Sequence, residues 1–202
     1  MCYAISTERS VGNHMTRDEI LDAAAQILSQ KGYHGTSMQD IAEAVHLQKA
    51  SLYHHITNKQ EILFDLLNRA LDTLIERVNE VISEPAPPDE RLRSAMRTYI
   101  CSMTANQDLA VILLLEHRSL EPDLQARHIL KRDQFEQIWR ELILEGQLNG
   151  SFACEHPAIS AQALLGAMNW VVTWFRHDGS LSASEISDQF ADLFLQGFLT
   201  RR

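Results

Sequence analysis

Apolar residues recur at every third or fourth position along most of this chain, the spacing that places them on one face of an α-helix. The first such segment runs over residues 16–31, where Ile20, Ala24, Ile27 and Leu28 share one face. A threonine followed three residues later by a glutamate opens it as a capping box, and a lysine–glycine pair closes it. No segment alternates apolar and polar residues for long enough to form a sheet, so we predict an all-α protein.

The same spacing predicts eight further helices, which makes about nine in all. Pro85, Pro87 and Pro88 end the long fourth helix and mark a break in the chain. We expect a short helix capped by residues 36–39, followed by helices at about 48–56, 59–82, 89–105, 108–118, 122–146, 157–177 and 183–200.

The second of the two short helices is too polar to be a core element. It carries Gln48, Lys49, Ser51, Tyr53 and His54, and no acidic side chain lies near it in the sequence. A helix that lies in the major groove of DNA needs such donors for base edges and phosphates. The alternative is the polar helix of an ordinary three-helix bundle, since two helices joined by four residues are common.

The net charge of −9 weighs against a nucleic-acid-binding protein, but it is unevenly distributed. Residues 16–60 hold four basic and five acidic side chains, the first fifteen residues are neutral, and the remaining −8 lies after residue 60. Because salt screens charges beyond about 8–10 Å, a local cationic strip can contact phosphates on an otherwise acidic body. The charge therefore does not exclude DNA.

The sequence gives little support for a membrane protein, a secreted protein, an enzyme or a metal-binding protein. No apolar run approaches the ~20 residues of a membrane span, and no signal peptide is recognisable, so we expect no membrane partner. Cys2, Cys101 and Cys154 have no close pairing, which fits reduced thiols and a cytoplasmic location. Catalytic and phosphate-binding motifs are missing, and the adjacent His54 and His55 point about 100° apart on a helix, a poor metal site.

We therefore predict no catalytic residue, no cofactor and no metal, and a protein that is not an enzyme. An all-helical enzyme, or a small-molecule-binding module that does not bind DNA, remains the alternative. The two predictions differ in whether a specific duplex is bound with a steep dependence on salt.

The last two predicted helices are apolar over broad faces and must be buried on more than one side. A thick monomer core is one explanation, and a two-fold four-helix interface between two copies is the one that we favour. The residues expected in that interface are Leu164, Met168, Val171, Trp174, Phe190, Phe194 and Phe198.

A ligand pocket is expected among the middle helices, the usual place for one in a helical bundle. For each candidate residue, simple core packing or surface exposure is the competing interpretation. The candidates are Met96, Tyr99, Ile100, Met103, Leu114, Phe135 and Trp139, with Arg118, His117, His128 or Asn169 as polar anchors.

Residues 36–63 resemble the DNA-binding segment of the TetR family of one-component regulators, and the resemblance is specific over about residues 16–65. The departures are His46 and Ala50 in place of two glycines, Gln48 in place of a serine cap and Ile56 in place of phenylalanine. Histidine tolerates a positive φ, so the turn can survive. The matching positions are Thr36 or Ser37, Ile41, Ala42, Leu52, Tyr53, His55, Lys59 and Leu63.

This resemblance implies a ligand-responsive repressor that binds a palindromic operator in double-stranded DNA as a homodimer. It divides the chain into a flexible tail over 1–15, a helix-turn-helix domain over 16–60, and a ligand-binding and dimerisation domain over 61–202. Residues 168–186 resemble members that respond to acyl-CoA, which implies a small hydrophobic or acyl-CoA effector. The same resemblance implies that Arg118, Arg127, Lys131 or Arg132 meets the CoA phosphates, with ordinary solvated charges as the alternative. The residues expected at the DNA are Thr36, Ser37, Gln48, Lys49, Ala50, Ser51, Tyr53, His54, His55 and Lys59.

Overall fold

The computed structural model describes residues 15–198, without the side chain of Phe198. The tail predicted over residues 1–15 therefore lies almost wholly outside the described residues, as does the end of the helix predicted to reach residue 200. The described part is all-α, as predicted. Its helices are α1 (Arg17–Gly35), α2 (Met38–Ala44), α3 (Lys49–His55), α4 (Lys59–Ile82), α5 (Pro88–Ala105), α6 (Gln107–Leu115), the 3₁₀ turn η1 (Glu116–Ser119), α7 (Pro122–Leu148), α8 (Pro157–Trp174) and α9 (Ala183–Phe198).

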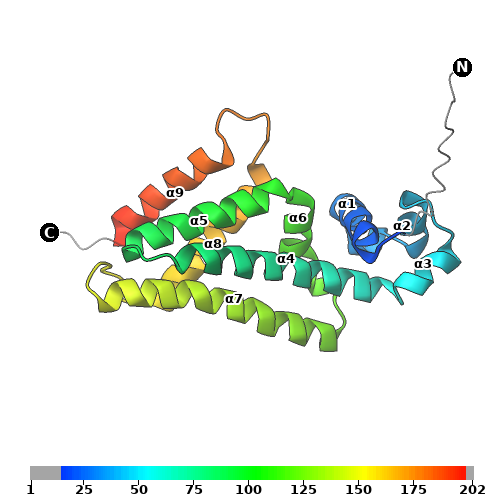
Figure 1. Ribbon diagram of the computed structural model, residues 1–202, viewed down its shortest axis with the longest axis horizontal. Helices are drawn as coiled ribbons and strands as arrows, with labels where there is room; N and C mark the ends of the chain where they lie inside the picture. The colour runs from blue at the N-terminus through cyan, green and yellow to red at the C-terminus, as the bar shows by residue number, and fades with distance from the viewer. Residues whose placement is uncertain (1–14, 199–202) are drawn as a thin grey trace, which may run out of the picture.

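Helices α1, α2 and α3 form a small head at one end of an elongated molecule, and α4 runs from this head into a larger helical body (Figure 1). Capping boxes start the first two helices: Thr16 pairs with Glu19, and Ser37 pairs with Asp40. Each box satisfies amide groups that a helix start leaves without partners. Helices α1 and α2 therefore begin where the sequence predicts.

The turn between α2 and α3 depends on one residue in the left-handed region. His46 has a φ of 55°, and the next amide, that of Leu47, donates to the carbonyl of Ala42 at 2.8 Å. This confirms that histidine can replace glycine at this turn. Gln48 makes no side-chain cap, so α3 begins at Lys49, one residue later than predicted.

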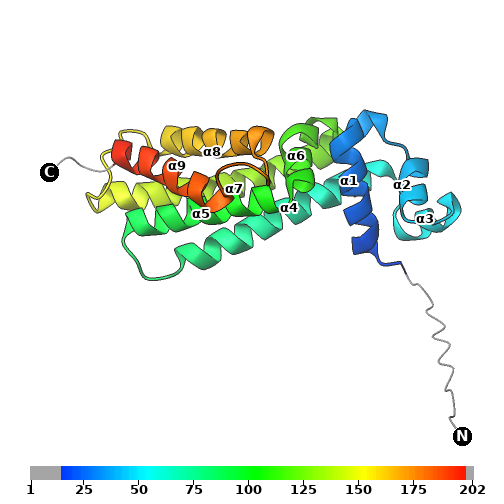
Figure 2. The ribbon, with the colours of Figure 1, turned by 90° about the horizontal axis from the view of Figure 1, so that it is seen from above.

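The body packs α4, α5, α7 and α8 around a common core, with α9 lying along α5 (Figure 2). The ends of α7 and α8 lie at other residues than predicted. Helix α8 ends at Trp174 instead of residue 177, because Phe175 adopts an extended conformation with its ring turned into the core. Helix α7 continues through Gly146 to Leu148, because the ring of Phe152 occupies the space beside that glycine.

No single helix in the described part is both long enough and apolar enough to cross a membrane. Helices α5 and α6–η1 reach that length and apolarity only when taken together, and they meet at 102°.

Candidate nucleic-acid interface and internal cavity

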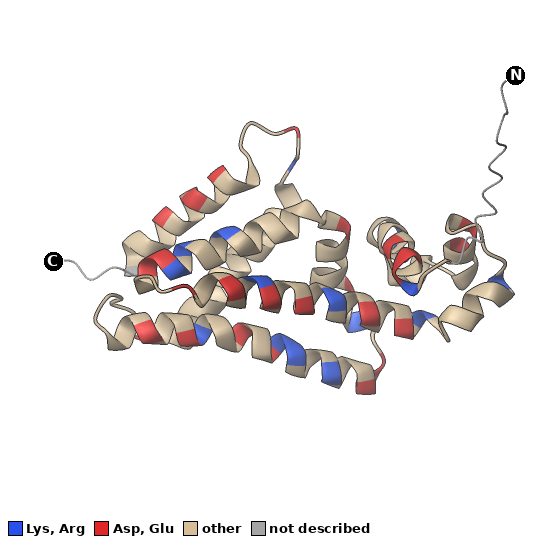
Figure 3. Ribbon diagram, viewed as in Figure 1, with Lys and Arg blue, Asp and Glu red and all other residues tan. Residues whose placement is uncertain are grey.

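The outer side of α3 carries most of the polar side chains expected at DNA. Gln48, Lys49, Ala50, Tyr53 and His54 are exposed, whereas the leucine on the opposite side of the helix is buried. The helix lies at the tip of the molecule and carries no acidic residue (Figures 1 and 3). Within residues 15–198 the ammonium group of the α3 lysine has no ion-pair partner. This surface is accessible to a duplex and offers it hydrogen-bond donors.

Arg17 anchors the end of α3 to the rest of the head. Its guanidinium donates to the carbonyl of His55 at 2.6 Å and also pairs with Glu61 and Asp65 on α4. These two carboxylates are the first acidic groups after α3, and the arginine offsets their charge. The anchor therefore fixes the orientation of α3 and limits repulsion of phosphates near it.

Two residues that were expected to contact DNA form hydrogen bonds within the protein instead. The side chain of Thr36 is buried and donates to the carbonyl of Gly32 at 2.9 Å. The Lys59 ammonium donates to the carbonyls of Tyr33 and Thr36 at 2.7 and 2.6 Å, and burial lowers its pKa. We correct both expectations, because the Thr36 hydroxyl bonds back to α1 and the Lys59 ammonium joins α4 to the end of α1 and to Thr36. Ser37 remains exposed at the start of α2.

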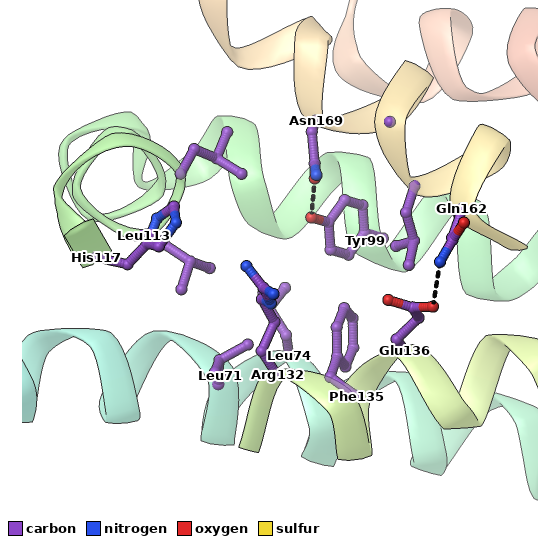
Figure 4. Close-up of a pocket in the computed structure, with 13 residues that line it drawn as sticks. Leu71, Leu74, Tyr99, Leu113, His117, Arg132, Phe135, Glu136, Gln162 and Asn169 are labelled. Carbon is purple, nitrogen blue, oxygen red and sulfur yellow. Dashed lines mark hydrogen bonds between the residues drawn. The ribbon is translucent and has the colours of Figure 1, made fainter. Parts of the chain in front are cut away.

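A cavity of about 330 Å³ lies inside the body, between α4, α5, α6, η1, α7 and α8. The hydroxyl of Tyr99 donates to the side-chain oxygen of Asn169 at its inner end, and the Tyr99 ring stacks on Phe135 (Figure 4). Burial raises the pKa of Tyr99, so this hydroxyl keeps its proton. The lining residues are Leu71, Leu74, Tyr99, Leu113, Leu114, His117, Arg132, Phe135, Glu136, Gln162, Leu165, Gly166 and Asn169.

Family models identify both parts of the chain. The model described as "Bacterial regulatory proteins, tetR family" matches residues 20–66, and that described as "Tetracyclin repressor-like, C-terminal domain" matches residues 85–198. The chain belongs to the TetR family. It is a ligand-responsive, DNA-binding transcriptional regulator and not an enzyme.

Relatives in this family match nearly the whole chain. The HTH-type transcriptional repressor KstR2 of Mycobacterium tuberculosis is 27% identical over 183 residues, which make up 90% of this chain and 92% of KstR2. The structure of PfmR from Thermus thermophilus has a TM-score of 0.83 and 35% identity, covering 91% of this chain and 100% of PfmR. AibR in complex with isovaleryl coenzyme A and operator DNA has a TM-score of 0.82 and 33% identity, covering 88% of this chain and 96% of AibR.

In this TetR-family regulator the cavity contains only some of the predicted ligand contacts. Tyr99, Leu114, Phe135 and Asn169 line it. The other candidates do not: Met96, Ile100, Met103 and Trp139 belong to the surrounding core, and Arg118 is exposed outside.

The cavity has four further polar lining residues. His117 was among the expected polar anchors and Arg132 among the expected contacts for CoA phosphates, whereas Glu136 and Gln162 are absent from the predicted set. A signal existed for Glu136, because it lies four residues after Arg132 and therefore on the same face of α7.

His128 is the polar residue most deeply buried beside the cavity. Neither ring nitrogen has a hydrogen-bond partner within the described part of the chain, and only 1% of the residue is exposed. Burial, reinforced by the nearby charges of His117, Arg132 and Lys131, lowers the pKa of His128 to about 4. The folded protein therefore holds this imidazole neutral in a range where the unfolded chain takes up a proton.

The neutral imidazole of His128 makes the folded protein less stable as the pH falls. We expect His128→Leu to remove this pH dependence. Between about pH 6.5 and pH 4 only the unfolded state gains this proton, which costs the wild type on the order of 3 kcal/mol of unfolding free energy. Urea unfolding at about pH 7 and about pH 4.5 measures the loss. We expect a smaller acid-induced loss in the variant. Equal losses in both proteins would contradict a neutral buried His128.

The outward face of α8 differs from the predicted dimer face. Leu164, Met168 and Val171 are buried against α5, α6 and α7, so the expectation that they contact a second copy is corrected. Ile159 and Trp170 lie on the opposite, exposed face, together with the predicted interface residue Trp174. On α9, Phe190 and Phe194 are half-buried beside the exposed Leu193, and the Phe198 side chain lies outside the described structure.

Proposed function

We propose that this regulator represses transcription as a homodimer that binds a palindromic operator and releases it when an acyl effector enters the cavity. The observation that carries the proposal is the exposed, carboxylate-free face of α3 at the tip of the molecule. AibR, a TetR-fold relative that binds operator DNA and isovaleryl coenzyme A, supports the pairing of these two ligands. As a regulator of chromosomal genes the protein would act in the cytoplasm.

The DNA contacts in this proposal come from the head, which we assign to residues 16–60. Lys49 would donate to guanine edges or to phosphate, and Gln48 would pair with adenine. Ala50 allows close approach and suits a thymine methyl group. The other contacts are phosphate contacts, which fix the register of the head on the duplex. We assign these to Ser37, Ser51, Tyr53 and His54, with the half-buried His55 in a supporting position.

A second copy of the chain is the partner that we assign to the exposed face of α8 and α9. Trp170 and Leu193 are large apolar side chains on that face, and Ala163, Gly166 and Gly197 are small exposed positions that permit close helix approach. A two-fold pair through these helices would present two α3 helices to the two halves of a palindrome.

The cavity suits the acyl end of an effector better than a complete coenzyme A thioester. Its volume of about 330 Å³ lies near the lower limit of ligand pockets, and its inner part is formed by leucines and aromatic rings. We therefore assign the acyl group to the cavity and the remainder of a thioester to its mouth. The domain that holds this ligand would comprise residues 61–202.

A direct route connects the cavity to the head. Cavity residue His117 lies in η1, whose last residue is Ser119. The side-chain amide of Gln60 donates to the Ser119 carbonyl at 2.9 Å and to the Tyr33 hydroxyl at 2.8 Å, and its oxygen accepts from the amide of Glu121 at 2.9 Å. An effector that displaces η1 would thus move α1 and the start of α4, and with them the spacing of the two α3 helices.

Replacing Gln60 with leucine should weaken the coupling between effector and operator. The variant retains the cavity and α3 but loses all three bonds to the η1–α7 junction and to α1. We expect effector affinity within about threefold of wild type and a coupling free energy at least about 1 kcal/mol smaller. Operator anisotropy with and without effector measures this quantity. Gln137→Leu, on the exposed side of α7, is the control, and unchanged coupling in Gln60→Leu would reject the route.

Titration of a protein–operator complex with isovaleryl-CoA and hexanoyl-CoA tests the proposed function as a whole. The expected result is dissociation of the operator at effector concentrations that also saturate the protein. If compounds bind to the protein but leave operator affinity unchanged, the proposed switch is wrong.

A further inference from the structure

Arg132 lines the cavity at its solvent-exposed side and lacks an ion-pair partner among residues 15–198. Figure 4 shows its guanidinium directed into the space between the Leu113–His117 side and Tyr99. The nearby carboxylate of Glu136 is already held by Arg140 and by the side-chain amide of Gln162. Arg132 therefore forms no ion pair with the carboxylate that lies nearest to it in the cavity wall.

Two imidazoles lie beside this guanidinium. His117 lines the same cavity, and burial together with Arg132 lowers its pKa. The ring of His128 lies behind it, with 6.1 Å between ring centroids, and neither of its nitrogens is satisfied within the described residues. Buried polar atoms without partners are unfavourable. In the described part of the chain, the unsatisfied atoms at this end of the cavity are the two ring nitrogens of His128, while the Arg132 charge beside them is exposed to solvent.

We propose that Arg132 and His117 form an anion subsite, and that the effector carries an oxyanion bound there while its apolar part extends toward Phe135. This inference rests on the proposed function, because it assigns a charge to the same effector. A planar guanidinium binds carboxylate or phosphate with two parallel hydrogen bonds, and a neutral hydroxyl cannot replace that interaction. Two sources supply such a group: the carboxylate of a free short-chain acid, or a phosphate of an acyl thioester whose pantetheine arm lies along the mouth, beside the exposed Arg132.

Calorimetric titration of the full chain with four probes distinguishes these sources. Hexanoate and hexan-1-ol differ in the carboxylate, and hexanoyl-CoA and hexanoyl-pantetheine differ in the phosphorylated adenosine moiety, which carries all of the phosphates. We expect Arg132→Gln to weaken binding of the anionic member of at least one pair by about tenfold or more, and to change the neutral member by less than about threefold. Arg132→Lys should retain part of the affinity, since it keeps the charge but loses the planar fork.

Arg176→Gln is the matched control, because it removes an exposed arginine that pairs with Asp178 outside the cavity. A selective loss for hexanoate identifies the carboxylate, and a selective loss for hexanoyl-CoA identifies the phosphate; either supports the subsite. If Arg132→Gln weakens the binding of neutral and anionic probes equally, or weakens the binding of neither, the proposed anion subsite is wrong. The assignment of the acyl group to the cavity is not affected by that result. If none of the four probes binds the wild type, the acyl effector of the proposed function fails as well.

Discussion

Replacing Lys49 with alanine is expected to weaken operator binding by at least about thirtyfold. A good side-chain contact to a base is worth about 1–3 kcal/mol, and a dimer loses two of them. The side chain is exposed at the start of α3 and makes no ion pair within the described part of the protein, so its removal should leave the fold intact. Fluorescence anisotropy with a labelled operator measures the affinity, and thermal unfolding verifies that the head is unchanged.

The control for Lys49→Ala is Arg176→Ala, which removes one positive charge just beyond α8, away from any expected DNA contact. We expect this control to bind the operator within about threefold of wild type, because exposed charges beyond the Debye length are screened. Equal losses in the two variants would mean that net charge, and not the α3 surface, governs binding.

Replacing Trp170 with glutamate is expected to convert the dimer to a monomer. Exposed tryptophans at interface centres commonly contribute about 2 kcal/mol or more, and a two-fold interface loses the residue twice. Burying two like charges at the same place adds to the cost. Sedimentation should show dissociation at concentrations about a hundredfold or more above those of the wild type, with a parallel loss of operator affinity.

Leu130→Glu is the control for this second prediction. Leu130 is 66% exposed on α7, and Trp170 is 67% exposed on α8, so both substitutions place a charge at an equally accessible apolar position. The control should remain dimeric. Should Trp170→Glu stay dimeric as well, the interface would have to lie elsewhere on the molecule.

Local rules of helix formation predicted most of the fold from the sequence. The capping boxes at Thr16 and Ser37 depend on residues three positions apart, so they need no tertiary information. The same holds for the left-handed turn at His46, which has few alternatives between two short helices. The exposure of Lys49 and Tyr53 follows because their helical face contains no apolar residue large enough to be buried.

The sequence could not determine properties that depend on how helices pack. Helix α8 has two apolar stripes, and periodicity alone did not reveal that Leu164 faces inward while Trp170 faces outward. The roles of Thr36 and Lys59 were also misassigned, because both are polar residues beside the expected DNA surface. Their partners are carbonyls of the protein: Thr36 donates to Gly32 within the end of α1, and Lys59 reaches Tyr33 and Thr36 through the packing of α4 against that end.

Selection of bound duplexes from a random pool, followed by anisotropy of the enriched sequence over a range of salt, tests the central claim most directly. We predict one enriched palindrome with half-sites about one helical turn (~34 Å) or a multiple of that apart, and an affinity that falls steeply as salt rises. A pool that shows no enriched sequence, with weak binding that is equal for all duplexes, would contradict the assignment of α3 as the operator-reading helix.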